Sequence, residues 1–262
     1  MATLPPFHLH GDVLVILGGL GIVYWWLQRR FHPSRGHKAR FSVGLGLLIV
    51  TSSWPMHDLA EQSLYWVHMV NHMVLTLVAP PLLILGFTRS MADYVVDRRP
   101  VLAWLRPLAH PVVAFAIFNL GLIATHWPEA VALSLRSEPA HFGIHTFLFG
   151  SGLLVWLPVF SPASAIPRIA PPIQLLYLFL NSILPIVPAG FLTFSEVPLY
   201  PVYGDASLAF GLTPVADQTI AGLIMKIVGT LIFWAIMAFI WFRWAAEEKR
   251  WDRLEEELRA PI

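Results

Sequence analysis

Two pairs of histidines share one spacing in this chain: His68 with His72, and His141 with His145. Residues four apart lie on one face of an α-helix, so each pair would present two imidazoles side by side. Both pairs stand in stretches apolar enough to cross a membrane, where a polar side chain is costly and usually functional. Imidazole binds copper, zinc, iron and nickel, and it also ligates haem. The spacing therefore predicts a metal or haem site; the alternative is a hydrogen-bonded polar face between two helices.

Further candidate ligands lie near these pairs in the sequence. The chain has no cysteine, which excludes disulfides and thiolate metal sites, so a soft ligand would have to be methionine. Met69 and Met73 share the four-residue spacing, although packing is the commoner role of methionine in a membrane helix. The other candidates are His57, Asp58 and Asp217, the last of which would otherwise cap the helix that it opens. The remaining histidines are expected to be interfacial side chains: His8, His10, His32, His37 and His110.

The composition indicates an integral membrane protein built from α-helices. Of the 262 residues, 56% are hydrophobic and 13% are charged, whereas soluble domains carry about 25% charged residues. The net charge of +1 gives no support to a nucleic-acid partner. A helix needs about 20 apolar residues to cross a bilayer. We therefore predict an all-α fold with seven transmembrane helices, at residues 12–29, 41–56, 63–86, 110–127, 140–159, 172–194 and 217–243.

Basic residues predict the orientation of these helices. They concentrate after the first, third, fifth and seventh predicted helices, whereas the alternate segments hold mostly acidic residues. Because cytoplasmic loops are the basic ones, the N-terminus should lie outside and the C-terminus in the cytoplasm. Residues 1–244 would form the transmembrane domain and residues 245–262 a charged cytoplasmic helical tail. Residues 88–109 are expected to form an amphipathic surface segment.

This topology places the candidate ligands on one side of the membrane. The predicted helices with the two histidine pairs both begin at the outer face, and His126 stands where another helix ends there. The sequence leaves open whether the two pairs form one site or two. Lys226 lies well inside the last predicted helix, where a charge is expensive, so it should pair with a carboxylate, face a cavity or be neutral. Pro80 and Pro81 should kink the third predicted helix.

Several of these segments resemble one known family when they are taken together. They are His68–Met73 with Val78–Leu83, His126-Trp127-Pro128 with His141, His145 and Trp156-Leu157-Pro158, and Asp217-Gln218 with Ala221–Met225. The combination resembles the membrane-integral CtaG family of cytochrome c oxidase assembly factors, from about residue 50 to residue 240. A single-span copper chaperone that shares the family's name depends on cysteine, so it is a different protein.

The resemblance implies a multi-pass protein of the bacterial plasma membrane that is not an enzyme. Such a protein would bind copper and deliver it to a subunit of a haem–copper oxidase, and it could form a homo-oligomer. The family pattern carries over, as metal ligands, to His68, His72, His126, His141 and His145, and it also includes Asp217 and Gln218. The sequence departs from the family at Lys226, where tryptophan is frequent.

Two other functions are compatible with paired histidines in a membrane. A haem-binding electron-transfer protein would use them as axial ligands, although two haems would crowd in one half of the membrane. A copper transporter would use Asn181, Pro185, Pro188 and Lys226 along its path, although the seven-helix layout shows no inverted repeat. The sequence disfavours an intramembrane zinc protease of the His-Glu-x-x-His type, because neither pair has the adjacent glutamate.

Overall fold

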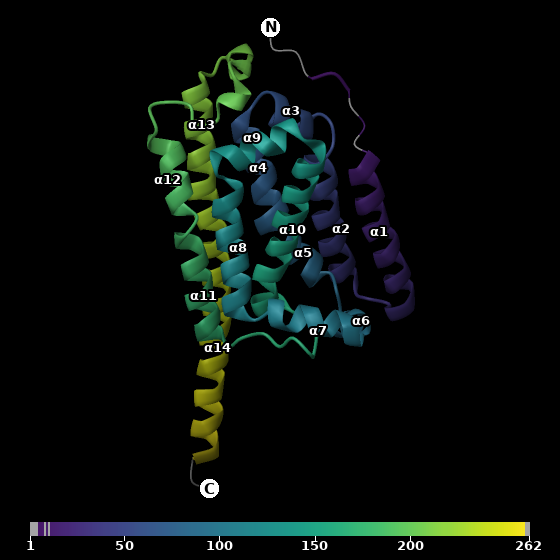
Figure 1. Ribbon diagram of the computed structural model, residues 1–262. Coiled ribbons are helices and arrows are strands. Elements are labelled where there is room, and N and C mark those ends of the chain that lie inside the picture. Colours follow the sequence, from purple (N-terminus) through teal and green to yellow (C-terminus); the bar gives the residue numbers. More distant parts are fainter. Residues whose placement is uncertain (1–4, 8, 10, 260–262) are drawn as a thin grey trace.

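The computed structural model describes residues 5–7, 9 and 11–259, and every regular element within these residues is a helix (Figure 1). The prediction of an all-α fold is therefore confirmed. The longer helices run side by side in one bundle, with α1 at one edge and α11, α12 and α14 at the other. The expected interfacial residues His8 and His10 lie outside the described residues.

The described residues form fourteen α-helices, several of which are parts of one longer span. They are α1 (Gly11–Phe31), α2 (Arg35–Thr51), α3 (Met56–Gln62), α4 (Tyr65–Met73), α5 (Ala79–Leu85), α6 (Arg89–Val96), α7 (Arg99–Leu108), α8 (Pro111–Thr125), α9 (Pro128–Arg136), α10 (Glu138–Phe160), α11 (Pro171–Ile183), α12 (Ile186–Phe194), α13 (Pro214–Leu223) and α14 (Gly229–Arg259). Two π-helical segments, η1 (Val74–Val78) and η4 (Ile224–Val228), join α4 to α5 and α13 to α14. Two short 3₁₀ helices, η2 (Pro201–Tyr203) and η3 (Ala206–Phe210), lie between α12 and α13.

Four helical stretches among the described residues are long and apolar enough to cross a membrane: Tyr65–Leu85, Glu138–Phe160, Pro171–Phe194 and Pro214–Arg259. Each corresponds to a predicted span. The helices α7 and α8 supply a fifth if they are one span broken by a bend of 72°. The helices α1, of 21 residues, and α2, of 17 residues, are not among these stretches, so the number of seven spans stays a prediction.

The second helix was predicted with the wrong limits. We expected it at 41–56, whereas α2 occupies Arg35–Thr51. The side chain of Ser34 accepts a hydrogen bond from the backbone N–H of His37, and this N-cap starts the helix earlier. The basic residues of this segment therefore stand on the first turns of a helix and not in a loop.

The consecutive prolines of the third span produce a π-helical segment. Pro80 has no backbone N–H, so the carbonyl of Thr76 loses its usual α-helical donor. The chain widens over η1, where the N–H of Ala79 reaches the carbonyl of Val74. The indole Nε1 of Trp156 in α10 donates to the Thr76 oxygen at 3.1 Å and replaces the missing bond. The sequence predicted a kink here but did not predict the partner that compensates for it.

Close packing at this place fixes α10 against the third span. A Cβ atom on Gly152 would lie 3.0 Å from both the Cα and the carbonyl oxygen of Thr76, so any larger residue would press on the backbone of the third span. The buried Trp156 lies one turn further along the same helix, in the main apolar cluster of the bundle. Gly152 and Trp156 thus set the position of α10 relative to α4, and these two helices carry the histidine pairs.

Short helices and a long extension complete one end of the molecule. In Figure 1, α6 and α7 lie across the end of the bundle, and α14 continues well beyond it. None of the α7 side chains is buried, and Trp104 is 75% exposed, as expected for an amphipathic surface segment. The helix α14 runs without a break through Arg259, with an ion pair between Arg243 and Glu247. The predicted tail is therefore helical as far as the structure describes it.

Candidate metal centre

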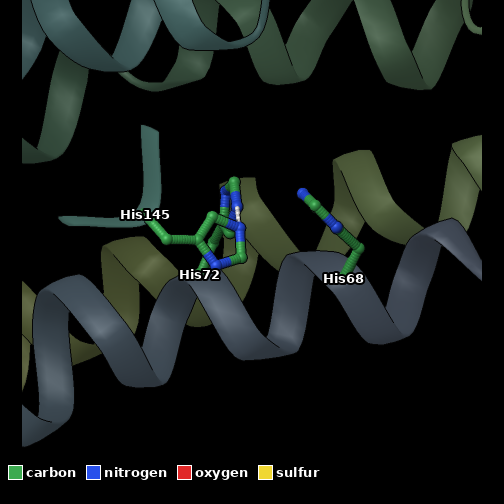
Figure 2. Close-up of side chains that lie close together, drawn as sticks. All are labelled: His68, His72 and His145. Carbon is green, nitrogen blue, oxygen red and sulfur yellow. Dashed lines mark hydrogen bonds between the residues drawn. The ribbon is translucent and has the colours of Figure 1, made fainter. Parts of the chain in front are cut away.

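Three imidazoles from two helices form a compact group, which we call the inner triad: His68 and His72 of α4 and His145 of α10 (Figure 2). Each offers one nitrogen, and these nitrogens all lie within 4.8 Å of one another. The Nε2 atoms of His72 and His145 are 3.4 Å apart. His68 and His72 are buried, at 6% and 5% exposed, and His145 is partly buried. The helical spacing of four places the first two on one face, and the packing of α10 adds the third.

The side chain of Asp217 holds the beginning of α4. Its two carboxylate oxygens accept hydrogen bonds from the backbone N–H groups of Tyr65 and Trp66, at 2.8 and 3.0 Å. These donors belong to the first turn of α4, where backbone N–H groups have no partner within the helix. The expectation that Asp217 caps its own helix is wrong, because Thr213 is the N-cap of α13. Asp217 instead caps α4 from a neighbouring helix, one turn before His68.

His126 lies beside the inner triad with one ring nitrogen available. Its Nδ1 is 2.7 Å from the carbonyl oxygen of Leu122, and a carbonyl can only accept, so Nδ1 carries the proton. Its Nε2 is buried and has no hydrogen-bond partner among the described residues. The ring centroids of His126 and His72 are 5.4 Å apart. A hydrogen bond that fixes one imidazole nitrogen and leaves the other as a lone-pair donor is typical of metal ligands.

A second group, which we call the outer triad, consists of His57 and Glu61 of α3 and His141 of α10. The Oε1 atom of Glu61 is 2.6 Å from Nε2 of His57 and 2.7 Å from Nε2 of His141. The hydroxyl of Ser134 lies 3.1 Å from Nδ1 of His141 and positions that ring. Sequence analysis missed Glu61, although His57 and Glu61 have the same four-residue spacing as the histidine pairs.

The surroundings of Glu61 favour its ionised form. Burial raises the pKa of this carboxyl, but the hydrogen bonds from His141 and His57 lower the pKa by more, so that it lies well below its usual range. Glu61 is therefore a carboxylate at neutral pH, and it brings a negative charge to the outer triad.

The two triads adjoin at α10. His141 and His145 stand one turn apart on this helix, and their ring centroids are 4.0 Å apart. The ring of His57 in the outer triad lies 6.1 Å from the ring of His145 in the inner one. The five predicted metal ligands thus fall into two touching groups: His68, His72 and His145 with His126 beside them, and His141 with the outer residues.

The remaining candidates occupy other positions. Met69 and Met73 are buried in the main apolar cluster, which agrees with packing as their role. Asp58 is 1% exposed, and its Oδ1 accepts a hydrogen bond from the side chain of Gln62. Neither Asp58 nor Asp217 belongs to one of the triads. The predicted interfacial residues His32 and His110 stand in the α1–α2 and α7–α8 connections, at the opposite end of the bundle from α3 and α9 (Figure 1).

Lys226 has an aromatic contact. It lies in η4, and its ammonium nitrogen is 5.6 Å from the ring centroid of Phe194. Among the residues that the structure describes, no carboxylate forms an ion pair with it. Phe194 is the last residue of α12, so the lysine side chain reaches from the last span toward the end of its neighbour. A cation over an aromatic face is one way to accommodate a charge within a membrane helix.

Comparison with protein families identifies the chain. The model of the cytochrome c oxidase caa3 assembly factor family, Caa3_CtaG, matches residues 21–247. The chain belongs to this family. The match covers both triads, His126 and all of the candidate spans up to residue 247, and it confirms the resemblance seen in the sequence motifs. No curated protein and no solved structure matches the chain. Membership of Caa3_CtaG makes this chain a membrane-embedded factor for the assembly of a cytochrome c oxidase.

Proposed function

We propose that this Caa3_CtaG protein binds copper at the inner triad and delivers it to a subunit of a haem–copper oxidase. The observation that supports this most is the buried group of three imidazoles, with a fourth, from His126, beside it. The role is that of a carrier and not of an enzyme, because the family is one of assembly factors. Copper is the cargo here, since the protein returns to its original state after each delivery.

The ligand chemistry of the inner triad suits copper transfer. Imidazole is a good ligand for copper, and the chain has no thiolate that would hold the ion more tightly. Three neutral ligands leave the coordination shell open, so a ligand of the oxidase subunit could enter before the carrier releases the ion. The buried Nε2 of His126, which has no partner among the described residues, fits a fourth ligand that binds only when metal is present.

The proposal includes the topology given by the charge distribution. Seven spans with the N-terminus outside would place α3, α9 and both triads at the outer face of the bacterial plasma membrane. In this topology the helices α1 and α2 are the first two of the seven transmembrane spans. The oxidase subunit would then dock laterally within the bilayer and receive copper at the outer face.

Metal analysis of the purified protein tests copper binding. We expect the double substitution His72→Ala and His145→Ala to remove at least one copper ion per chain, because two of the three inner ligands are lost. The matched control replaces His37 and His110, which lie outside both triads, by alanine and should keep the full copper content. An unchanged copper content in the His72/His145 variant would exclude the inner triad as the binding site.

An absorption spectrum of the same samples separates copper from haem. Two axial imidazoles need about 4 Å between their nitrogens, twice a typical metal–imidazole bond, whereas the Nε2 atoms of His72 and His145 are 3.4 Å apart. A porphyrin would also have to separate α10 from the third span, which touch at Gly152 and Thr76. We therefore expect no Soret band, and a stoichiometric Soret band would contradict the proposal.

A further inference from the structure

We propose that the outer triad is a second metal site, which takes a divalent transition-metal ion from the outer face and passes it to the inner triad. The existence of this site can be tested on its own, but the hand-off rests on the proposed function. Its ligands are the Nε2 atoms of His57 and His141 and a carboxylate oxygen of Glu61.

The geometry of the outer triad is that of a ligand set around a shared centre. One oxygen of Glu61 contacts both imidazoles, at 2.6 and 2.7 Å, and all three ligand atoms lie within 4.8 Å of one another. Two imidazoles with one carboxylate are an ordinary ligand set for divalent copper, zinc, iron or nickel. The carboxylate also offsets part of the ion's charge, which the inner triad cannot do because it contains only imidazoles.

Two neighbouring elements hold these ligands in place. The four-residue spacing of His57 and Glu61 puts both on one face of α3, and His141 stands in the first turn of α10. The Ser134 hydroxyl binds Nδ1 of His141, so the opposite nitrogen, Nε2, is the one presented to Glu61. A partner on the second ring nitrogen is the usual support of a metal-binding histidine.

The outer triad is the more open of the two groups, because two of its three ligands are only partly buried, against one of three in the inner triad. The side chain of Glu61 is 25% exposed and that of His141 is 13% exposed. His68 and His72 are 6% and 5% exposed. An ion that arrives from outside therefore meets a negatively charged, partly open site before it meets the more buried group of imidazoles.

The contact between the triads provides the step from one site to the other. His141 and His145 are successive members of one face of α10, and their ring centroids are 4.0 Å apart. His57 also lies near His145, with 6.1 Å between the ring centroids. The ion can therefore exchange the Glu61 carboxylate for the imidazoles of the inner triad by moving one helical turn, about 5.4 Å.

A simpler reading is that Glu61 only forms ion pairs with two histidines. Titration of the purified full-length protein with copper(II), followed by equilibrium dialysis, separates the two readings. We expect two copper ions per chain for the unmodified protein and one for Glu61→Gln, which removes the charged ligand. The control is Glu129→Gln, which removes an exposed carboxylate in the first turn of α9 and should still bind two. Two ions bound by Glu61→Gln would overturn the proposal.

Electron paramagnetic resonance of the unmodified protein avoids any effect of substitution on folding. Two copper(II) ions held about 5–6 Å apart, one turn of α10, should couple magnetically and give a half-field signal at the second equivalent. A protein that binds a single copper ion, or two uncoupled ions, would contradict adjoining sites.

The variants also separate failure of this site from failure of the proposed function. If the His72/His145 variant keeps all of its copper while Glu61→Gln loses one ion, the outer site stands and the proposed inner site fails. If the His72/His145 variant loses copper and Glu61→Gln does not, the outer site fails and the proposed function stands.

Discussion

Metal binding at this centre depends on which ring nitrogen of each histidine is left to act as a ligand. His126 donates a hydrogen bond from its Nδ1–H to the carbonyl oxygen of Leu122, and its Nε2 beside His72 has no partner among the described residues. His141 has its Nδ1 fixed by Ser134 and its Nε2 directed at Glu61. In both rings a local partner selects the nitrogen that remains for another ligand. This selection cannot be read from a spacing, because it depends on which hydroxyl or carbonyl lies next to each ring.

Asp217 should stabilise the protein through the beginning of α4. Replacing it by alanine leaves one buried and one partly buried backbone donor without partners, and the buried one alone costs about 1–3 kcal/mol in the free energy of unfolding. Thermal unfolding in detergent should therefore show a clear fall in the midpoint. Asp217→Asn keeps one acceptor oxygen, so its unfolding midpoint should fall by about half as much as that of the alanine variant. An alanine variant as stable as the unmodified protein would show that these hydrogen bonds do not hold α4.

Trp156 should matter for its indole N–H as well as for its volume. Phenylalanine keeps an aromatic ring but leaves the Thr76 carbonyl, freed by Pro80, without a donor, which costs about 1–3 kcal/mol. We expect Trp156→Phe to unfold at a lower temperature than Trp127→Phe, since Trp127 is 63% exposed. Equal unfolding temperatures for the two variants would mean that the Thr76 carbonyl finds another partner.

Among the helices, the strongly apolar and proline-marked segments could be predicted from sequence, and the short ones could not. The spans with His68 and His145 begin within two residues of their predicted starts, at Tyr65 and Glu138. The helix α3 was predicted as a loop because it has only seven residues and too few apolar ones to show a period. Glu61 was missed for that reason. The meeting of α3 with α10 is a tertiary contact without a local signal.

The packing of α10 against the third span gives a prediction for two glycines of one helix. Gly152→Ala places a Cβ atom 3.0 Å from the Thr76 backbone, and such overpacking costs about 1–3 kcal/mol. Gly150→Ala meets nothing within 4 Å and should be neutral, or stabilising by up to about 1 kcal/mol through helix propensity. Thermal unfolding of the two variants measures the difference. If both behave alike, α10 does not approach the third span as closely as the structure shows.

For the molecule as a whole, the charge pattern of the sequence predicts a more detailed topology than the helices alone establish. The apolar helices make it a multi-pass membrane protein, whereas the contribution of α1 and α2 depends on the charge pattern. The α1–α2 connection is the place to test whether these two helices cross the membrane. In the structure this connection stands at the same end of the bundle as α6 and α7, which is the cytoplasmic end under the seven-span topology (Figure 1).

The absence of cysteine allows this topology to be mapped without background. Single cysteines at Asp205, Lys38 and Lys249 would each replace an exposed residue. With a maleimide that does not cross membranes, we expect Asp205→Cys to react in intact cells. Lys38→Cys and Lys249→Cys should react only after permeabilisation, because both positions lie in the cytoplasm under the seven-span topology. Reaction of Lys38→Cys in intact cells would show that α1 and α2 do not cross as proposed.

The copper content of the client oxidase tests most directly whether this protein delivers copper. The oxidase would be purified from cells in which the only copy of this protein carries His72→Ala and His145→Ala, and from cells with the His37→Ala and His110→Ala control. We predict that the oxidase from the first cells contains its haem but is deficient in copper, while the control oxidase contains both. An oxidase with full copper content from cells that express the His72/His145 variant would contradict copper delivery through the inner triad.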